Sequence, residues 1–120
     1  MPFYKSLVLI HKTLKDYDKA TDYSLKALKV SEFSHGTESQ SLVMELSDIS
    51  DLYKLNDKPQ QAITFAERGV KILEQSKETD KLRLAEKLSD LAALYEATGN
   101  KTKAESLYKR SRNIYSEKSK

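Results

Sequence analysis

Asp48 and Asp51 have the spacing in this chain that most suggests chemistry. They lie one helical turn apart, as the carboxylates of a general acid-base pair or of a divalent-metal site can. A working site of either kind needs further partners such as a histidine or a cofactor motif. Neither accompanies the pair, so we interpret these aspartates as polar residues on a helix rather than as a catalytic centre.

The other reactive residue types also fail to form a recognisable site. His11 and His35 are not placed near a serine or aspartate in any catalytic pattern, and His35 precedes Gly36, where it can neutralise a helix C-terminus. The three glycines are too scattered for a phosphate-binding loop, and the absence of cysteine excludes thiolate chemistry. We therefore expect no enzymatic activity, no metal and no cofactor.

Composition and charge predict a cytoplasmic protein without nucleic-acid or membrane partners. The 120 residues include 21 Lys+Arg and 18 Asp+Glu, which interleave along the chain as on solvated helix faces. No apolar run approaches the roughly 18 to 20 residues of a membrane span. Residues 1–5 lack the basic start and the apolar middle of a signal peptide.

An internal repeat indicates the architecture that must position these residues. The segment LSDISDLY at residues 46–53 returns 42 positions later as LSDLAALY, at residues 88–95. The same offset links Ala20, Ala62 and Ala104, each of which follows a short polar break. Periods of this length are typical of helical solenoids, in which each repeat is one helix-turn-helix unit. The chain is expected to contain three such units.

Polar breaks divide the chain into six predicted helices. Asp16 and Asp80 are expected to cap two of them, and Gly36 and Gly99 are expected to end two, because glycine readily takes the left-handed conformation. The predicted ranges are residues 3–14, 17–35, 38–55, 58–76, 81–98 and 101–116.

Two further helix starts are predicted from capping-box spacing. Thr37 and Gln40 would begin the third helix, and Asp57 and Gln60 the fourth, with each side chain satisfying a free backbone donor. Pro59 lacks a backbone donor and is therefore tolerated in a first turn.

The repeated positions resemble the tetratricopeptide repeat (TPR), whose first helix has the pattern W-x2-L-G-x2-Y. The middle unit matches it with Leu46, Ile49, Ser50 and Tyr53, and in the first unit His11 lies where the pattern has tyrosine. The last unit has Leu88, Leu91, Ala92 and Tyr95 at these positions. The period of this chain is longer than that of the common repeat, which is about 34 residues. This longer form is similar to the repeats of kinesin light chains and bacterial peptide-responsive regulators.

This resemblance implies an all-α fold of three antiparallel helix pairs, stacked as a TPR-like right-handed superhelix (α-solenoid). The chain is expected to form one domain, residues 1–120, with units at about 1–36, 37–78 and 79–120. It implies a scaffold that binds a protein or peptide, as a module of a larger regulatory or signalling protein.

In the family, the first helix of each pair lines a concave groove. The residues beside the buried stripe of each first helix are Lys5, Leu9, Lys12, Met44, Ser47, Asp48, Asp51, Lys54, Glu86, Ser89, Asp90, Ala93 and Glu96. This row changes from basic to acidic along the chain, which suits a polarised peptide or one with a basic segment. Its aspartates oppose a clamp for a terminal carboxylate. The alternative is a solvated face without a ligand.

The final helix suggests a second possible function. Four of its residues are expected on the side where a further helix would stack: Leu107, Tyr108, Ile114 and Tyr115. Either further repeats of a longer array cover this side, or two chains pair through it; we expect weak self-association into a homodimer. The alternative to a binding scaffold is therefore a structural segment that dimerises through uncapped terminal helices.

Overall fold

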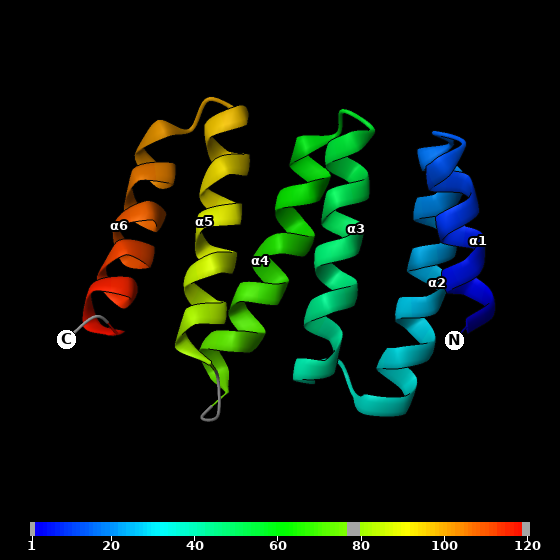
Figure 1. Ribbon diagram of the computed structural model, residues 1–120, viewed down its shortest axis with the longest axis horizontal. Helices are drawn as coiled ribbons and strands as arrows, with labels where there is room; N and C mark the ends of the chain where they lie inside the picture. Colours follow the sequence, from blue (N-terminus) through cyan, green and yellow to red (C-terminus); the bar gives the residue numbers. More distant parts are fainter. Residues whose placement is uncertain (1, 77–79, 119–120) are drawn as a thin grey trace.

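The computed structural model describes residues 2–76 and 80–118, with the side chains of residues 2, 3, 5 and 118 outside the description (Figure 1). No strand occurs in this described part, so the all-α prediction is confirmed. The elements are α1 (Pro2–Thr13), α2 (Tyr17–His35), the short 3-10 helix η1 (Gln40–Leu42), α3 (Val43–Leu55), α4 (Pro59–Gln75), α5 (Lys81–Ala97) and α6 (Lys101–Lys118).

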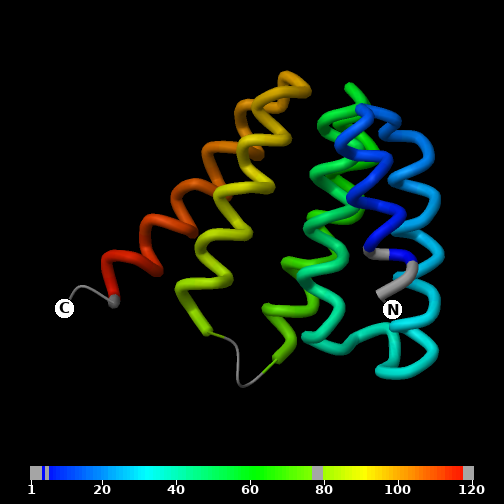
Figure 2. The backbone as a smooth tube through the Cα atoms, turned by 45° about the vertical axis from the view of Figure 1, so that its right-hand side comes forward, coloured from blue at the N-terminus to red at the C-terminus, as the bar shows by residue number. Residues whose placement is uncertain are grey.

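The helices form three antiparallel pairs in one row. Helices α1 and α2, α3 and α4, and α5 and α6 pack as hairpins, while α2 contacts α3 and α4 contacts α5. In the described residues, the backbone of each α-helix lies close only to those of the α-helices next to it in the chain. The row measures 44 × 32 × 21 Å, and Figure 2 shows the two termini at its opposite ends. This arrangement confirms the predicted solenoid of three stacked helix pairs.

Four of the predicted helix boundaries are set as expected. The Asp16 side chain accepts a hydrogen bond from the Lys19 amide at 3.3 Å, and Asp80 accepts one from the Leu82 amide at 3.0 Å. Gly36 and Gly99 both have φ of +86° just beyond their helices. A residue with a Cβ would be strained there, which explains glycine at both ends.

Both predicted capping boxes are wrong. The third helix does not begin at residue 38, because the Ser39 hydroxyl accepts from the Ser41 amide at 3.2 Å, η1 follows, and α3 starts only at Val43. Before α4, Asp57 has a left-handed φ of 57° and its amide donates to the Lys54 carbonyl at 3.1 Å. Asp57 therefore belongs to the closing turn of α3, and α4 starts at Pro59 without a side-chain cap.

Residues that are 42 positions apart occupy equivalent places in the core. Ala20, Ala62 and Ala104 are almost completely buried, and so are Leu46 and Leu88 of the duplicated segment. The small alanines allow the second helix of each pair to lie close to the first. The predicted burial of these positions is confirmed.

An aromatic contact recurs inside the first two helix pairs. The Tyr53 ring stacks on Phe65 with centroids 5.6 Å apart, and His11 stacks on Tyr23 at 5.5 Å. In both pairs the partner lies 12 positions further along, on the second helix. His11 therefore packs as the tyrosine that the repeat pattern places there would pack.

Ion pairs also recur at each junction between pairs. Arg68 of α4 pairs with Glu32 of α2, and Arg110 of α6 pairs with Glu74 of α4. Both members of the second pair lie 42 positions after those of the first. Each second helix is thus tied to the preceding second helix by the same kind of bond. The sequence pattern of apolar positions does not predict these ion pairs, because their residues lie outside that pattern.

A hydrogen bond from a tyrosine hydroxyl also links α4 and α5. Tyr95 donates to the Glu67 carboxylate at 2.7 Å. Burial of the ring and this hydrogen bond raise the pKa of Tyr95 to about 12. The phenol therefore remains a hydrogen-bond donor well into the alkaline range.

Candidate binding groove

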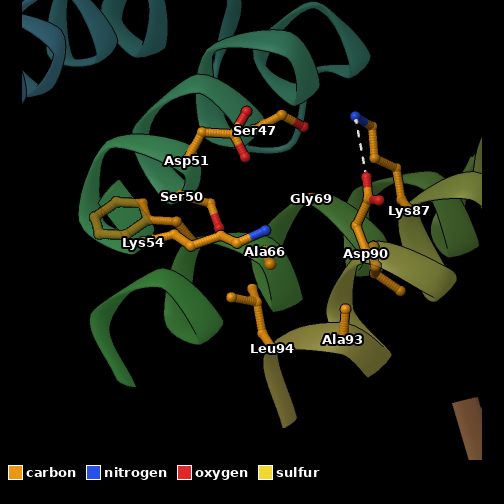
Figure 3. A pocket seen from close by; sticks show the side chains of 12 residues that line it. Ser47, Ser50, Asp51, Lys54, Ala66, Gly69, Lys87, Asp90, Ala93 and Leu94 are labelled. Atoms are coloured by element: carbon orange, nitrogen blue, oxygen red, sulfur yellow. Dashed lines mark ion pairs between the residues drawn. The ribbon is translucent and has the colours of Figure 1, made fainter. Parts of the chain in front are cut away.

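Two cavities open between successive first helices, whose backbones do not lie close to one another in the described structure. The central cavity lies between α3, α4 and α5 and has a volume of about 250 Å³ (Figure 3). The N-terminal cavity lies between α1, α2 and α3 and has a volume of about 520 Å³. Asp51 lines both, so the two cavities are neighbours along one groove.

The central cavity combines an apolar wall with a charged rim. Its apolar residues include Phe65, Ala66, Gly69, Val70 and Leu94. Asp51 and Lys54 come from α3, whereas Lys87 and Asp90 come from α5 (Figure 3). Ser47, Ser50 and Ala93 complete the lining. Such a mixture suits the side chains of a peptide, which present apolar and polar groups in alternation.

Charge is balanced within the central cavity. The Lys87 ammonium lies 4.0 Å from the Asp90 carboxylate. The pKa of Asp90 is nevertheless raised, chiefly because burial disfavours the ionised form. Lys87 opposes this shift, while the nearby carboxylates Glu86 and Asp51 add to it. The Asp90 side chain is still 63% exposed, so this desolvation is only partial.

The N-terminal cavity is more acidic. Its apolar wall consists of Val8, Leu9, Ala27 and Leu52. Its ionised side chains are one lysine and three carboxylates, namely Lys12, Glu45, Asp48 and Asp51. Ser24, Ser31 and His35 complete the lining.

Glu45 has an incomplete set of hydrogen bonds. The Ser31 hydroxyl donates to its Oε1 at 2.5 Å and fixes the carboxylate in place. Its Oε2 is buried and has no hydrogen-bond partner among the described residues. An unpaired buried carboxylate oxygen is costly, and a donor that entered the cavity would remove this cost.

Most residues of one cavity have a counterpart in the other, 42 positions along the chain. For example, Lys12 corresponds to Lys54, and Asp48 to Asp90. The further matched pairs are Val8 with Ser50, Leu9 with Asp51, Ser24 with Ala66, Ala27 with Gly69, Glu45 with Lys87, Asp51 with Ala93 and Leu52 with Leu94. The two cavities are thus formed by equivalent positions of successive repeats.

Eight of the predicted groove residues line these cavities: Leu9, Lys12, Ser47, Asp48, Asp51, Lys54, Asp90 and Ala93. Met44, Glu86, Ser89 and Glu96 line neither cavity. The Ser89 hydroxyl instead shares a hydrogen bond with Ser111 of α6, and Glu96 accepts one from Tyr108. The Lys5 side chain lies outside the described residues.

The prediction missed the contribution of the second helices. The second-helix residues that face the cavities are Ser24, Ala27 and Ser31 of α2, and Phe65, Ala66, Gly69 and Val70 of α4. The wheel geometry considered first helices alone. One available signal was the small residue at positions 27, 69 and 111, because a small side chain on a second helix leaves space between the neighbouring first helices.

The predicted self-association residues are mostly turned inward. Leu107 is buried, and Tyr108 and Ile114 pack against the core. Tyr115, by contrast, is 45% exposed. Of these four positions, it alone adds a large exposed apolar surface to α6.

Metal binding and membrane insertion find no support in the described residues. These contain no group of three metal-ligating side chains close enough to hold an ion. None of their helices is long and apolar enough to cross a bilayer.

Sequence comparison identifies the family. A tetratricopeptide repeat model matches residues 48–117, and a second model of the same description matches residues 3–33. The chain therefore belongs to the tetratricopeptide repeat family, whose members are generally non-catalytic scaffolds for protein interaction. Comparison with curated proteins gives no match.

Two solved structures share the fold. BtubC (BKLC) from P. vanneervenii superposes with a TM-score of 0.88 at 24% identity, over 97% of this chain and 46% of that one. A putative kinesin light chain from Podospora anserina, with nearly identical TPR-like repeats, gives a TM-score of 0.77 at 18% identity, over 96% of this chain and 55% of that one. The chain spans about half the length of these structures.

Proposed function

We propose that this chain is a peptide-binding scaffold, without catalytic activity, which holds an extended segment of a partner protein along the groove formed by the two cavities. The main observation in support is that two neighbouring cavities are lined by equivalent residues, 42 positions apart in the chain. An extended peptide advances by about 3.3 Å per residue, so it can place different side chains in successive cavities.

The proposal includes the wider setting of the module. The three units act together as one binding domain of a larger regulatory or signalling protein in the cytoplasm, without nucleic-acid partners. The interleaved charges and the absence of cysteine support this setting.

A peptide library with a charge-reversal variant tests the proposed groove. The wild-type protein should select a sequence motif, and Asp51→Lys should weaken the selected peptide about tenfold or more, because Asp51 borders both cavities. Glu105→Lys is the matched control, since Glu105 is exposed on α6 and lines neither cavity. Failure to select any motif would refute the proposal.

Self-assembly through α6 is the competing function, and the exposed Tyr115 is the observation in its favour. Sedimentation of the wild type and of Tyr115→Asp separates the two. A dimer that Tyr115→Asp dissociates, combined with no selected peptide, would favour assembly over peptide binding.

A further inference from the structure

The two cavities are built from equivalent repeat positions but differ in charge at three matched pairs: Leu9 with Asp51, Asp51 with Ala93, and Glu45 with Lys87. The first two differences cancel, because Asp51 lines both cavities, so the exchange of Glu45 for Lys87 sets the difference in charge. The central cavity has Lys87 at this position, and its ammonium lies 4.0 Å from the Asp90 carboxylate. The N-terminal cavity has Glu45 at the same position, beside Asp48, which is the counterpart of Asp90. The central cavity therefore provides its own cation, whereas the N-terminal cavity has a carboxylate in that place.

Among the described residues that line the cavities, the remaining charges do not offset this exchange. Lys12 and Lys54 are counterparts, so each cavity has one such lysine. With Glu45 in place of Lys87, the N-terminal cavity has three carboxylates against one lysine, and the central cavity has two against two. The described lining of the N-terminal cavity is therefore negative, although the whole chain has a net charge of +3.

A second observation also indicates a missing hydrogen-bond donor. Glu45 Oε2 is buried without a hydrogen-bond partner among the described residues, while Ser31 holds the other oxygen in place. A charged donor would satisfy this oxygen and offset the surplus of carboxylates. The apolar side chains of Val8, Leu9 and Leu52 provide a wall for the aliphatic stem of such a side chain.

We propose that the N-terminal cavity binds an arginine side chain of the partner peptide, whose guanidinium takes the place that the Lys87 ammonium occupies in the central cavity. Arginine fits better than lysine, because its planar guanidinium presents five donors and can bond more than one carboxylate of the lining. This inference rests on the proposed function and specifies the peptide that the groove selects, namely one with an arginine at a fixed position.

The test uses octapeptide libraries in which each position is fixed in turn as arginine, citrulline or glutamate. Citrulline has nearly the shape of arginine without its charge. The wild-type protein should prefer arginine over citrulline about tenfold at one position, and glutamate should be disfavoured further. Added salt should reduce the preference, because ionic interactions are screened.

Matched variants assign the preference to the N-terminal cavity. Glu45→Gln retains an acceptor for Ser31 and should bring arginine and citrulline within about threefold of each other. Glu105→Gln on α6 should leave the preference unchanged. Lys87→Glu should create a second arginine-preferring position in the central cavity. A misfolded variant would lose binding and could not gain such a preference.

The outcomes separate this inference from the proposed function. Equal binding of arginine and citrulline peptides, or an arginine preference that Glu45→Gln leaves intact, would overturn the arginine site while leaving peptide binding in place. Absence of binding to every library would overturn both.

Discussion

Single residues on the second helices determine how much space the groove offers. Positions 27, 69 and 111 are Ala, Gly and Ser, and the first two line the N-terminal and central cavities. Ser111 is buried and its hydroxyl donates to the Ala85 carbonyl at 2.8 Å. A large side chain at such positions would fill the groove, so small residues serve both packing and access.

Gly69→Ala should stabilise the protein by about 0.5 to 1 kcal/mol, because glycine is unfavourable in a helix interior. A Cβ at this position would approach Val43 Cγ1 only to 3.9 Å, an ordinary contact. Urea unfolding measures the change. Gly36→Ala is the control and should destabilise, since Gly36 has φ of +86°. Destabilisation by Gly69→Ala would show that α4 packs too tightly against α3 at this position to accept a Cβ.

Asp90→Asn should raise the stability of the unliganded protein at neutral pH. Burial raises the pKa of Asp90, so the folded state favours the protonated form, and this stabilisation is lost as the pH rises through the raised pKa. Asparagine does not ionise and avoids that loss. The advantage of the variant should therefore shrink as the pH falls towards the ordinary range of an aspartate. Thermal melts at several pH values measure it, and a constant difference would contradict the stated cause.

The positions of the helices were the feature that the sequence predicted best. The repeat offset and the polar breaks predicted all six α-helices and the burial of the alanines at 20, 62 and 104. The capping boxes failed because a three-residue spacing does not show whether a residue belongs to the preceding turn, as Asp57 does. The cavities were only half predicted, because their second-helix lining depends on how helices far apart in sequence lie together.

Ala62→Leu should cost about 1 to 3 kcal/mol, because a larger side chain would force α3 and α4 apart. Ala62 is fully buried, and its carbonyl accepts a hydrogen bond from the Ser50 hydroxyl at 2.8 Å, which the separation would also stretch. Thermal unfolding measures the loss. A rise in melting temperature would contradict the register of this helix pair.

Arg68→Ala should loosen the junction between the first two pairs at a cost of about 1 kcal/mol. Its guanidinium bonds Glu32 and also donates to the Thr37 carbonyl at 3.1 Å, so it ties α4 to α2 and to the loop beyond. Arg110→Ala removes the equivalent pair with Glu74, which is more exposed, and should cost less. Urea unfolding compares the two variants. A larger loss for Arg110→Ala would contradict this ranking.

The whole molecule is a short row of three equivalent units in which each helix pair contacts only its neighbours. Repetition creates the same cavity twice, and the exchange of Glu45 for Lys87 makes the two copies different in charge. Exposed apolar side chains occur on the first pair, including Leu9, Leu14 and Phe33, whereas those of α6 mostly pack inward. Sequence periodicity alone did not predict this asymmetry, because it depends on which face each helix turns towards its partner.

We propose that a partner peptide lies along the groove on the first-helix side. Amide chemical shifts of the ¹⁵N-labelled protein, titrated with its tightest library peptide, test this claim directly. The largest changes are expected in α1, α3 and α5 around Leu9, Asp51 and Asp90, which line the two cavities. Changes confined to α6 around Tyr115 would contradict the claim.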